Sequence, residues 1–343
     1  MRSLYILLFC AFISSINSQE KLTNENILDS ILFLAKENSV NTNYIDWNKV
    51  TKKVKATLNL KDTSQYALAK PTQLLLTELN DFHGAIIING NRFMGNVKKE
   101  NNSTYTNNQE IASTLYQKSI EGYKININML KKNIGYIEIP TINIGADYGS
   151  IDLATNIIRD SICKLLSKKP IKLVIDLRTN VGGNLYPMLS GLGILFPDLK
   201  LGGDSKDGKM FNSNWELKNG DFYMSNYQMT SIPINCNCEN KIKKYIVLTS
   251  RYTTSSGEAV ASSLKGQQNI ILMGEKTSGY SSTNSWFKIT ENIIFSPATA
   301  YYMSIDKTFH KNGIIPNIVI IEELDLTDLT SGIIFEKALD LLK

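Results

Sequence analysis

The sequence predicts an α/β protein whose core follows a helical N-terminal region. From residue 134 onward, short apolar runs typical of strands alternate with segments of helical spacing, an arrangement characteristic of α/β folds. The expected strands are residues 134–139, 171–175, 245–249, 270–273, 286–295, 301–303 and 318–321. The expected helices of this part are residues 151–166, 186–195, 255–264 and 333–342.

Residues 19–90 show helical periodicity instead of this alternation. Their apolar residues recur at turn-related spacings, namely Ile27, Ile31 and Leu34 and then Trp47, Val50, Val54 and Leu58. We therefore expect a small helical cap at residues 19–90. Residues 91–130 are polar and rich in asparagine, which predicts an exposed linker or loop, and the core is expected at residues 131–343.

The first 18 residues have the pattern of a secretory signal. Arg2 precedes an apolar stretch at residues 4–13, and small or polar residues follow as far as Ser18, where cleavage is expected. Cys10 does not indicate a lipoprotein, because the bulky Phe9 precedes it. The apolar stretch is too short to cross a bilayer, and no later segment offers the ~20 apolar residues that a membrane span requires. We expect an exported protein, periplasmic or extracellular, without a transmembrane segment.

Charge and composition exclude several function classes. The formal net charge of +5 is modest and the basic residues are scattered, so nucleic acid is not an expected partner. The sequence has no phosphate loop, dinucleotide fingerprint or histidines at metal-ligand spacing, so we expect no cofactor and no metal. Beyond the leader, Cys163, Cys236 and Cys238 form an odd set that predicts one disulfide and one free thiol, with the pairing open.

A loop with two adjacent glycines follows one of the predicted buried strands. Residues 171–175 form an apolar run, and Gly182 and Gly183 come shortly after it, where bare amides are able to approach a ligand oxygen. A tight turn that needs positive φ explains a lone glycine pair equally well. Asp176 and Arg178 are interpreted as bracing this loop by charge-assisted hydrogen bonds.

A serine at the start of the predicted helix 255–264 is a candidate nucleophile. The helix dipole and the first-turn amides around Ser255 suit an attacking hydroxyl and a developing oxyanion. A capping box from Ser255 to Glu258 explains the same residues in structural terms. The chain has two histidines as candidate bases, His83 after the predicted end of a cap helix and His310, which we expect at the surface.

Taken together and in order, these features resemble the S41 serine peptidases, a family that includes the tail-specific (C-terminal processing) proteases and the tricorn core protease. Five elements carry the resemblance: Leu-x-Asp-x-His at 79–83, Asp-Leu-Arg-x-Asn-x-Gly-Gly at 176–183, Ser-x-x-Glu at 255–258, Gly-Glu-Lys-Thr-x-Gly at 274–279, and Gly-Ile-Ile-Pro-Asn-Ile at 313–318. The resemblance implies a crotonase-like (ClpP/crotonase) β/α spiral core and hydrolysis of a peptide or protein substrate.

The resemblance also implies roles for individual residues. Ser255 would be the nucleophile and His83 the base, with the amides of Ser256 and of Gly182 or Gly183 as oxyanion donors. The tail-specific branch instead uses a Ser-Lys dyad with its lysine in a Gly-Lys-Gly element, where this chain has Gly-Tyr-Ser at residues 279–281. Tail-specific relatives also insert a PDZ domain between leader and core, for which residues 91–130 are too few.

The tricorn branch pairs serine with histidine and so fits this chain better. That branch adds a second serine directly before its histidine, where this chain has Phe82, and a glutamate far downstream. Residues 306–313 contain no glutamate, and Asp306 is the candidate acid to orient His83 through its second ring nitrogen, with a plain turn residue as the equal alternative. Lys276 is the nearest substitute for the absent lysine, although a solvated charge explains it better.

A second function class stays open at this point. A crotonase-like core is able to bind acyl groups through paired amides without covalent chemistry, so a catalytically inactive binding protein for a hydrophobic ligand or peptide is the alternative. The ordered pair of His83 and Ser255 favours hydrolysis, and their separation in the fold discriminates the two hypotheses.

Overall fold

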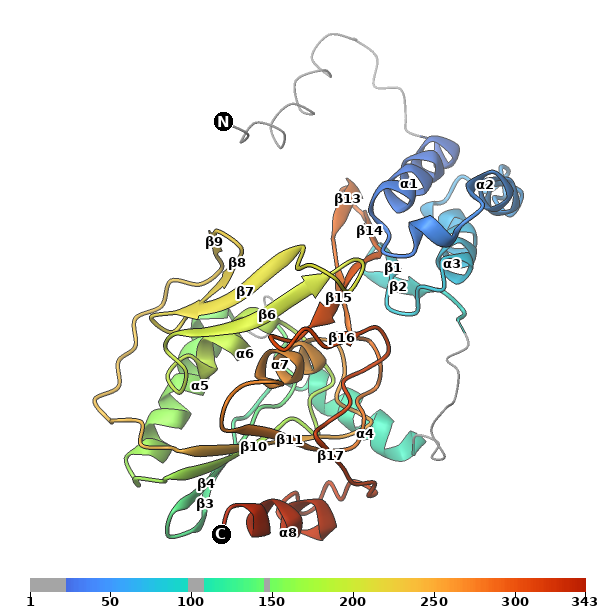
Figure 1. Cartoon of the computed structure of the whole chain (residues 1–343). Helices are drawn as coiled ribbons and strands as arrows, with labels where there is room; N and C mark the ends of the chain where they lie inside the picture. Colours follow the sequence, from blue (N-terminus) through green and yellow to red (C-terminus); the bar gives the residue numbers. More distant parts are fainter. Residues whose placement is uncertain (1–22, 98–107, 145–148) are drawn as a thin grey trace.

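The computed structural model describes residues 23–97, 108–144 and 149–343, and its central element is a six-stranded sheet (Figure 1). The strands are β3 (Ile127–Lys131), β4 (Ile134–Glu138), β5 (Lys172–Asp176), β10 (Lys244–Thr249), β11 (Ile270–Gly274) and β17 (Ile318–Val319). Their order is β17-β11-β10-β5-β4-β3, and every pair is parallel except β3 with β4. The carboxyl ends of the parallel strands therefore lie at one edge, where the predicted site loops begin.

Alternate side chains of this sheet enter two different cores. Leu173, Ile175 and Val247 pack towards three helices, α5 (Ile151–Leu166), α6 (Leu185–Leu192) and α7 (Ser256–Leu264). Val174, Ile246 and their neighbours on the opposite face pack against α8 (Gly332–Leu341). This period of two explains why the strands read as continuous apolar runs, since both faces are buried.

A second sheet covers the other side of helices α5 to α7 (Figure 1). It contains β12 (Ser282–Asn284), β15 (Ala298–Met303), β6 (Leu199–Ser205), β7 (Ser213–Lys218), β8 (Asp221–Met224) and β9 (Tyr227–Gln228) in that order, with β16 (Phe309–His310) beside β15. Trp215, Phe222 and Tyr302 contribute its side of the shared core. The helices thus lie between two sheets, and the prediction of an α/β core is confirmed.

The N-terminal region is a cap with its own apolar core. Its helices are α1 (Asn24–Asn38), α2 (Trp47–Lys55) and α3 (Ala69–Glu78), with 3₁₀ turns at Thr42–Tyr44 and Gln65–Leu68. They pack on a four-stranded sheet of order β13-β14-β1-β2, formed by β13 (Phe287–Thr290), β14 (Ile293–Ser296), β1 (Ala85–Ile88) and β2 (Asn91–Met94). The cap is therefore not helical throughout, and a hairpin from late in the chain completes it.

Two predictions for individual segments are wrong. Residues 286–295 form a hairpin rather than one strand, since β14 pairs with β1 of the cap. Residues 91–130 hold β2, α4 (Gln109–Ile120) and most of β3, so they are not a simple linker, although residues 98–107 lie outside the described residues.

The three cysteines within the described residues form one disulfide and one free thiol. Cys163 on α5 is bonded to Cys236, and Cys238 is free. All three sulfur atoms lie within 4.8 Å of one another. The predicted secretory signal lies outside the described residues. In the part of the chain that is described, we find no helix long and apolar enough to cross a membrane.

Candidate active site

Ser255 occupies the sharp junction between β10 and α7. Its backbone has φ 53° and ψ −115°, a conformation that costs a non-glycine residue roughly 1–3 kcal/mol and that marks functional turns. The Ser255 amide donates to Glu258 Oε2 at 2.9 Å, so the Glu258 side of the expected capping box is formed. The Ser255 hydroxyl lies 3.2 Å from Nε2 of His83. The predicted nucleophile and base are therefore brought within hydrogen-bond reach.

His83 lies in a turn that Asp81 organises. The buried Oδ1 of Asp81 accepts from the amides of His83 at 3.1 Å and Gly84 at 2.6 Å, while Oδ2 accepts from the Ala298 amide at 2.8 Å. Burial raises the pKa of Asp81, and these amide donors oppose that rise. Asp81 thus explains the Leu-x-Asp-x-His pattern, because it ties the histidine turn to the strand that leads into the core.

The second ring nitrogen of His83 does not meet Asp306. Nδ1 lies 2.7 Å from the hydroxyl of Ser282 on β12. Asp306 accepts from the Thr308 amide at 2.9 Å and lies beside Gly266, just beyond the C-terminal end of α7. Ser255 stands at the other end of that helix, about 13 Å away at 1.5 Å per residue. The turn role of Asp306 is therefore the one that the structure supports.

His310 is buried, so the expectation of a surface position is wrong. Only 3% of it is exposed, and its Nε2 lies 2.6 Å from the Ser304 hydroxyl. Burial, with a smaller effect of Lys265, lowers the pKa of His310 to about 4, against the opposing charge of Asp306. Its environment is that of a neutral core histidine.

The two adjacent glycines have positive φ, at 114° for Gly182 and 103° for Gly183. A Cβ on Gly182 would lie 3.1 Å from that of Ser255, so the glycine loop abuts the serine turn. The Gly182 amide donates to Asn180 Oδ1 at 2.9 Å. It is therefore already hydrogen-bonded, which does not fit the expected role of an oxyanion donor. Within the described part of the chain, the amides of Gly183 and Ser256 make no hydrogen bond. The Ser256 hydroxyl donates to the Gly183 carbonyl at 2.7 Å and so ties the glycine loop to the first turn of α7.

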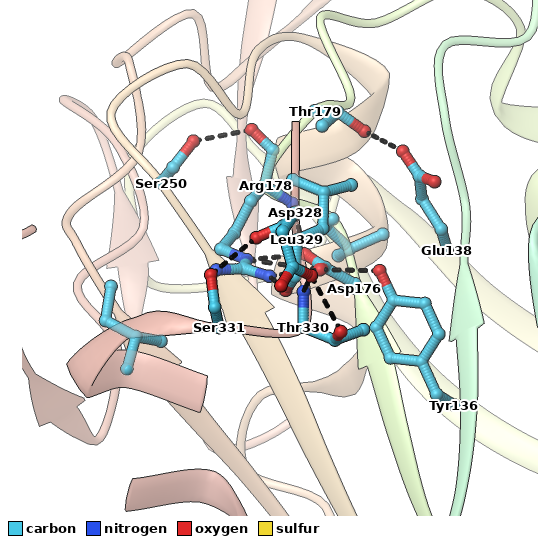
Figure 2. Close-up of polar contacts among 12 residues, drawn as sticks. Tyr136, Glu138, Asp176, Arg178, Thr179, Ser250, Asp328, Leu329, Thr330 and Ser331 are labelled. Carbon is cyan, nitrogen blue, oxygen red and sulfur yellow. Dashed lines mark hydrogen bonds and ion pairs between the residues drawn. The ribbon is translucent and has the colours of Figure 1, made fainter. Parts of the chain in front are cut away.

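A buried ion pair braces the start of this loop, as the sequence indicates (Figure 2). Arg178 donates to Asp176 through Nε at 3.0 Å and Nη2 at 2.6 Å, and also to the Leu329 carbonyl. The Tyr136 hydroxyl donates to Oδ2 of Asp176 at 3.0 Å. Ser250 donates to the Arg178 carbonyl at 2.6 Å, which joins the loop to the segment that precedes Ser255. None of these side chains lies at Ser255, and their role is structural.

The structure adds residues near His83 that the sequence did not reveal. Tyr280, in place of the dyad lysine, packs its ring edge-on against the imidazole, and Asn284 and Arg92 donate to the His83 carbonyl at 3.1 and 2.9 Å. Glu258 Oε1 accepts from Thr277 and from the Gly279 amide at 2.8 Å. The short strand β12, with the sequence Ser-Thr-Asn, matches no motif, so Asn284 could not be found from the sequence. Tyr280 could be noticed, because it replaces the dyad lysine.

A cavity of about 630 Å³ lies at the carboxyl ends of β4 and β5. Its lining includes Glu138, Thr141, Thr179 and the segment 326–330. The Thr179 hydroxyl donates to Glu138, as Figure 2 shows. Ser255 and His83 do not line it. The cavity thus adjoins the brace of the glycine loop.

The fold and site define a mixed α/β protein in which a cap histidine meets a core serine. A sequence profile of peptidase family S41 matches residues 133–320, more than half of the chain. The chain belongs to peptidase family S41, and it is peptidase-like at that level.

Two curated relatives match part of the chain. It is 31% identical over 140 residues to the nisin-resistance protein of Lactococcus lactis subsp. lactis, which is 41% of this chain and 43% of the relative. It is 26% identical over 173 residues to the carboxyl-terminal-processing protease of Synechocystis sp., 49% of this chain and 36% of the relative. The match spans less than half the length of either protein.

Solved structures share the fold over nearly the whole chain. A lipoprotein from Streptococcus agalactiae has a TM-score of 0.63 at 18% identity, covering 93% of this chain and 96% of that one. The photosystem II D1 C-terminal processing protease has a TM-score of 0.53 at 12% identity, with coverage of 87% and 92%. At these identities the likeness concerns the fold.

Proposed function

We propose that the protein is an exported serine-type peptidase in which Ser255 is the nucleophile and His83 the general base. The observation that carries this proposal is the 3.2 Å separation of Ser255 Oγ and His83 Nε2. The two residues are 172 positions apart in the sequence and come from the core and the cap. A serine paired with a base in this way is the usual arrangement of covalent acyl transfer.

The geometry supports a specific sequence of steps. His83 Nε2 takes the hydroxyl proton as Ser255 Oγ attacks the peptide carbonyl, and the resulting imidazolium returns that proton to the leaving amine. The amides of Gly183 and Ser256 are the donors available for the oxyanion, in place of the hydrogen-bonded Gly182 amide. Water activated by the same histidine then releases the acyl group and restores Ser255.

The remaining alternatives for the base have less support. Lys276 is exposed to solvent, and the position of the family's dyad lysine holds Tyr280, whose burial raises the pKa of its hydroxyl. His310 hydrogen-bonds to Ser304 within the core. His83 is the histidine whose ring nitrogen meets the Ser255 hydroxyl.

A fluorophosphonate probe tests the activated serine directly. We expect the purified wild type to be labelled at Ser255, as located by mass mapping, and labelling to disappear in Ser255→Ala and in His83→Ala. Ser263→Ala is the matched control, because Ser263 lies on the same helix with a buried hydroxyl that makes no hydrogen bond in the described chain. A folded wild type that is never labelled would instead support the non-catalytic binding protein.

Export and substrate need separate measurements. We propose that residues 1–18 are removed on secretion, which N-terminal sequencing of protein expressed with its leader would detect. A fully retained leader in the cell fraction would contradict it. Because one relative is a nisin-resistance protein, nisin is a concrete peptide to test first. We expect its cleavage, followed by mass spectrometry, to depend on Ser255.

A further inference from the structure

We propose that Ser282 and Asn284 are positioning residues that hold the proton of neutral His83 on Nδ1, so that a hydroxyl and an amide take the place of an acid. The mechanistic meaning of this arrangement rests on the function proposed above. The chain of groups runs from Ser255 through the His83 ring to Ser282 and then to Asn284, and it returns to the His83 backbone.

The direction of each hydrogen bond in this series follows from its last member, the contact between Asn284 and the His83 carbonyl. The side-chain amide of Asn284 lies 3.1 Å from the backbone carbonyl of His83. A carbonyl oxygen only accepts, so the atom that faces it is the Asn284 nitrogen. The other end of the same amide, Oδ1, then faces the Ser282 hydroxyl at 3.0 Å. An amide oxygen also only accepts, and the Ser282 proton therefore points to Asn284.

The orientation of Ser282 in turn sets the state of the histidine ring. A serine hydroxyl has one proton, and with that proton given to Asn284 it presents a lone pair to Nδ1 of His83 at 2.7 Å. Nδ1 must carry the proton for this contact to be a hydrogen bond. A neutral imidazole then has its lone pair on Nε2, which faces Ser255 Oγ at 3.2 Å. This is the tautomer that a general base requires.

The surroundings keep both side chains in place. Ser282 is 3% exposed and pairs with Tyr301 in the ladder of β12 and β15. Arg92 donates to the same His83 carbonyl that Asn284 contacts, so the accepting group is held from a second side. Ser282 and Asn284 therefore come from β12 of the second sheet, and the cap contributes Arg92 of β2.

Labelling rates test the proposal in the intact mature protein. We expect the rate of fluorophosphonate labelling to fall about 10- to 100-fold in Ser282→Ala and about tenfold in Asn284→Ala, because the base then spends less time in the active tautomer. Asn284→Asp retains an acceptor for the Ser282 proton but loses the donor to the His83 carbonyl, and we expect its labelling rate to lie between those of Asn284→Ala and the wild type. A purely structural role for the side chain would not give this partial recovery.

Ser285→Ala is the matched control for these variants. Ser285 follows the same strand, and its hydroxyl lies 3.2 Å from that of Thr299 instead of the histidine. We expect it to be labelled at the wild-type rate. If Ser282→Ala is labelled as fast as Ser285→Ala, the positioning role is overturned while the Ser255 and His83 mechanism stands.

A second measurement does not depend on activity. The chain has only two histidines, so ¹⁵N-histidine labelling gives a spectrum in which the protonated and bare ring nitrogens of His83 are distinguishable, with His83→Gln for assignment. We expect a protonated Nδ1 and a bare Nε2 in neutral His83 of the wild type, and loss of that preference in Ser282→Ala. A proton on Nε2 in the wild type would overturn the proposal even if Ser255 is labelled. An unlabelled wild type with the expected tautomer would refute only the proposed function.

Discussion

The ring of Tyr280 packs edge-on against the imidazole of His83, with centroids 5.4 Å apart and planes at 78°. Tyr280 follows Gly279, whose amide is held by Glu258, and the other oxygen of Glu258 holds the Ser255 amide. One buried carboxylate thus links the serine turn to the turn that presents an aromatic ring to the base. Tyr280 stands where the tail-specific relatives that this chain resembles have the lysine of their Ser-Lys dyad.

We expect Tyr280→Ala to reduce the labelling rate of Ser255 about tenfold, because loss of the ring contact lets His83 move away from the serine. Tyr280→Phe keeps the ring, and its rate should stay within about threefold of the wild type. Second-order labelling rates at pH 7.5 check both variants. Equal losses in the two variants would assign the effect to the phenol hydroxyl rather than to the ring.

The two adjacent glycines should respond differently to alanine. A Cβ on Gly182 meets the Cβ of Ser255 at 3.1 Å, so Gly182→Ala should impair labelling more than stability. A Cβ on Gly183 would lie 2.2 Å from the Ile142 carbonyl, a backbone atom, so Gly183→Ala should lower the free energy of unfolding by roughly 3 kcal/mol.

Gly90→Ala is the control for these glycine variants. Gly90 also has positive φ, at 80°, but a Cβ there meets nothing within 4 Å. It should cost about 1 kcal/mol from backbone strain and leave labelling unchanged. Urea unfolding and labelling rates of all three variants separate the effects, and equal behaviour of Gly90→Ala and Gly183→Ala would contradict the steric argument.

Core helices were predictable because local signals define them. The expected helix 151–166 coincides with α5, whose first turn is capped by Ser150 and whose apolar stripe faces the sheet. The hairpin of β13 and β14 was not predictable in the same way, since its place depends on pairing with β1 from the other end of the chain. The segment after residue 201 is glycine-rich and charged, yet it forms β6 and β7 by mutual pairing.

In the candidate site too, residues within sequence motifs were predictable, whereas residues placed by strand register were not. Ordered motifs pointed to Ser255 and His83, and the structure brings them together. The partner of the second ring nitrogen could not be predicted, because the register of β12 against β15 places Ser282 there and no sequence pattern encodes that register. Asp306 was suggested only by analogy of position, and the length of α7 separates it from the serine.

Breaking the buried brace of the glycine loop should be costly. Asp176 is fully buried and Arg178 is 3% exposed, so Asp176→Asn leaves a guanidinium without its charge partner and should cost about 3–5 kcal/mol. Tyr136→Phe removes one hydrogen bond to the carboxylate and should cost about 1.5 kcal/mol.

Urea unfolding at pH 7 measures both losses. Lys288→Met disrupts the exposed pair with Glu291, whose side chains are 60% and 87% exposed, and should give no measurable change. If Asp176→Asn were no more destabilising than Lys288→Met, the ion pair would not be the brace that we describe.

Buried His310 should make the fold sensitive to acid. Its pKa is lowered to about 4, mainly by burial, whereas an unfolded histidine titrates near 6.5. Between these values the unfolded chain binds a proton that the folded chain does not, so the contribution of His310 to stability is complete above pH 6.5 and is lost as the pH falls towards 4. From pH 7 to pH 5 this loss should be about 2 kcal/mol.

The comparison of wild type with His310→Asn isolates that contribution. Asp204 has the opposite pH dependence, because burial raises its pKa to about 6. Its contribution to the stability of the fold is complete below pH 3.8 and is lost as the pH rises through 6. Asp204 is present in both proteins, so its contribution cancels in their difference. We expect urea unfolding at pH 7 and pH 5 to show that the variant loses about 2 kcal/mol less than the wild type. Parallel pH dependences would mean that His310 is not held neutral in the core.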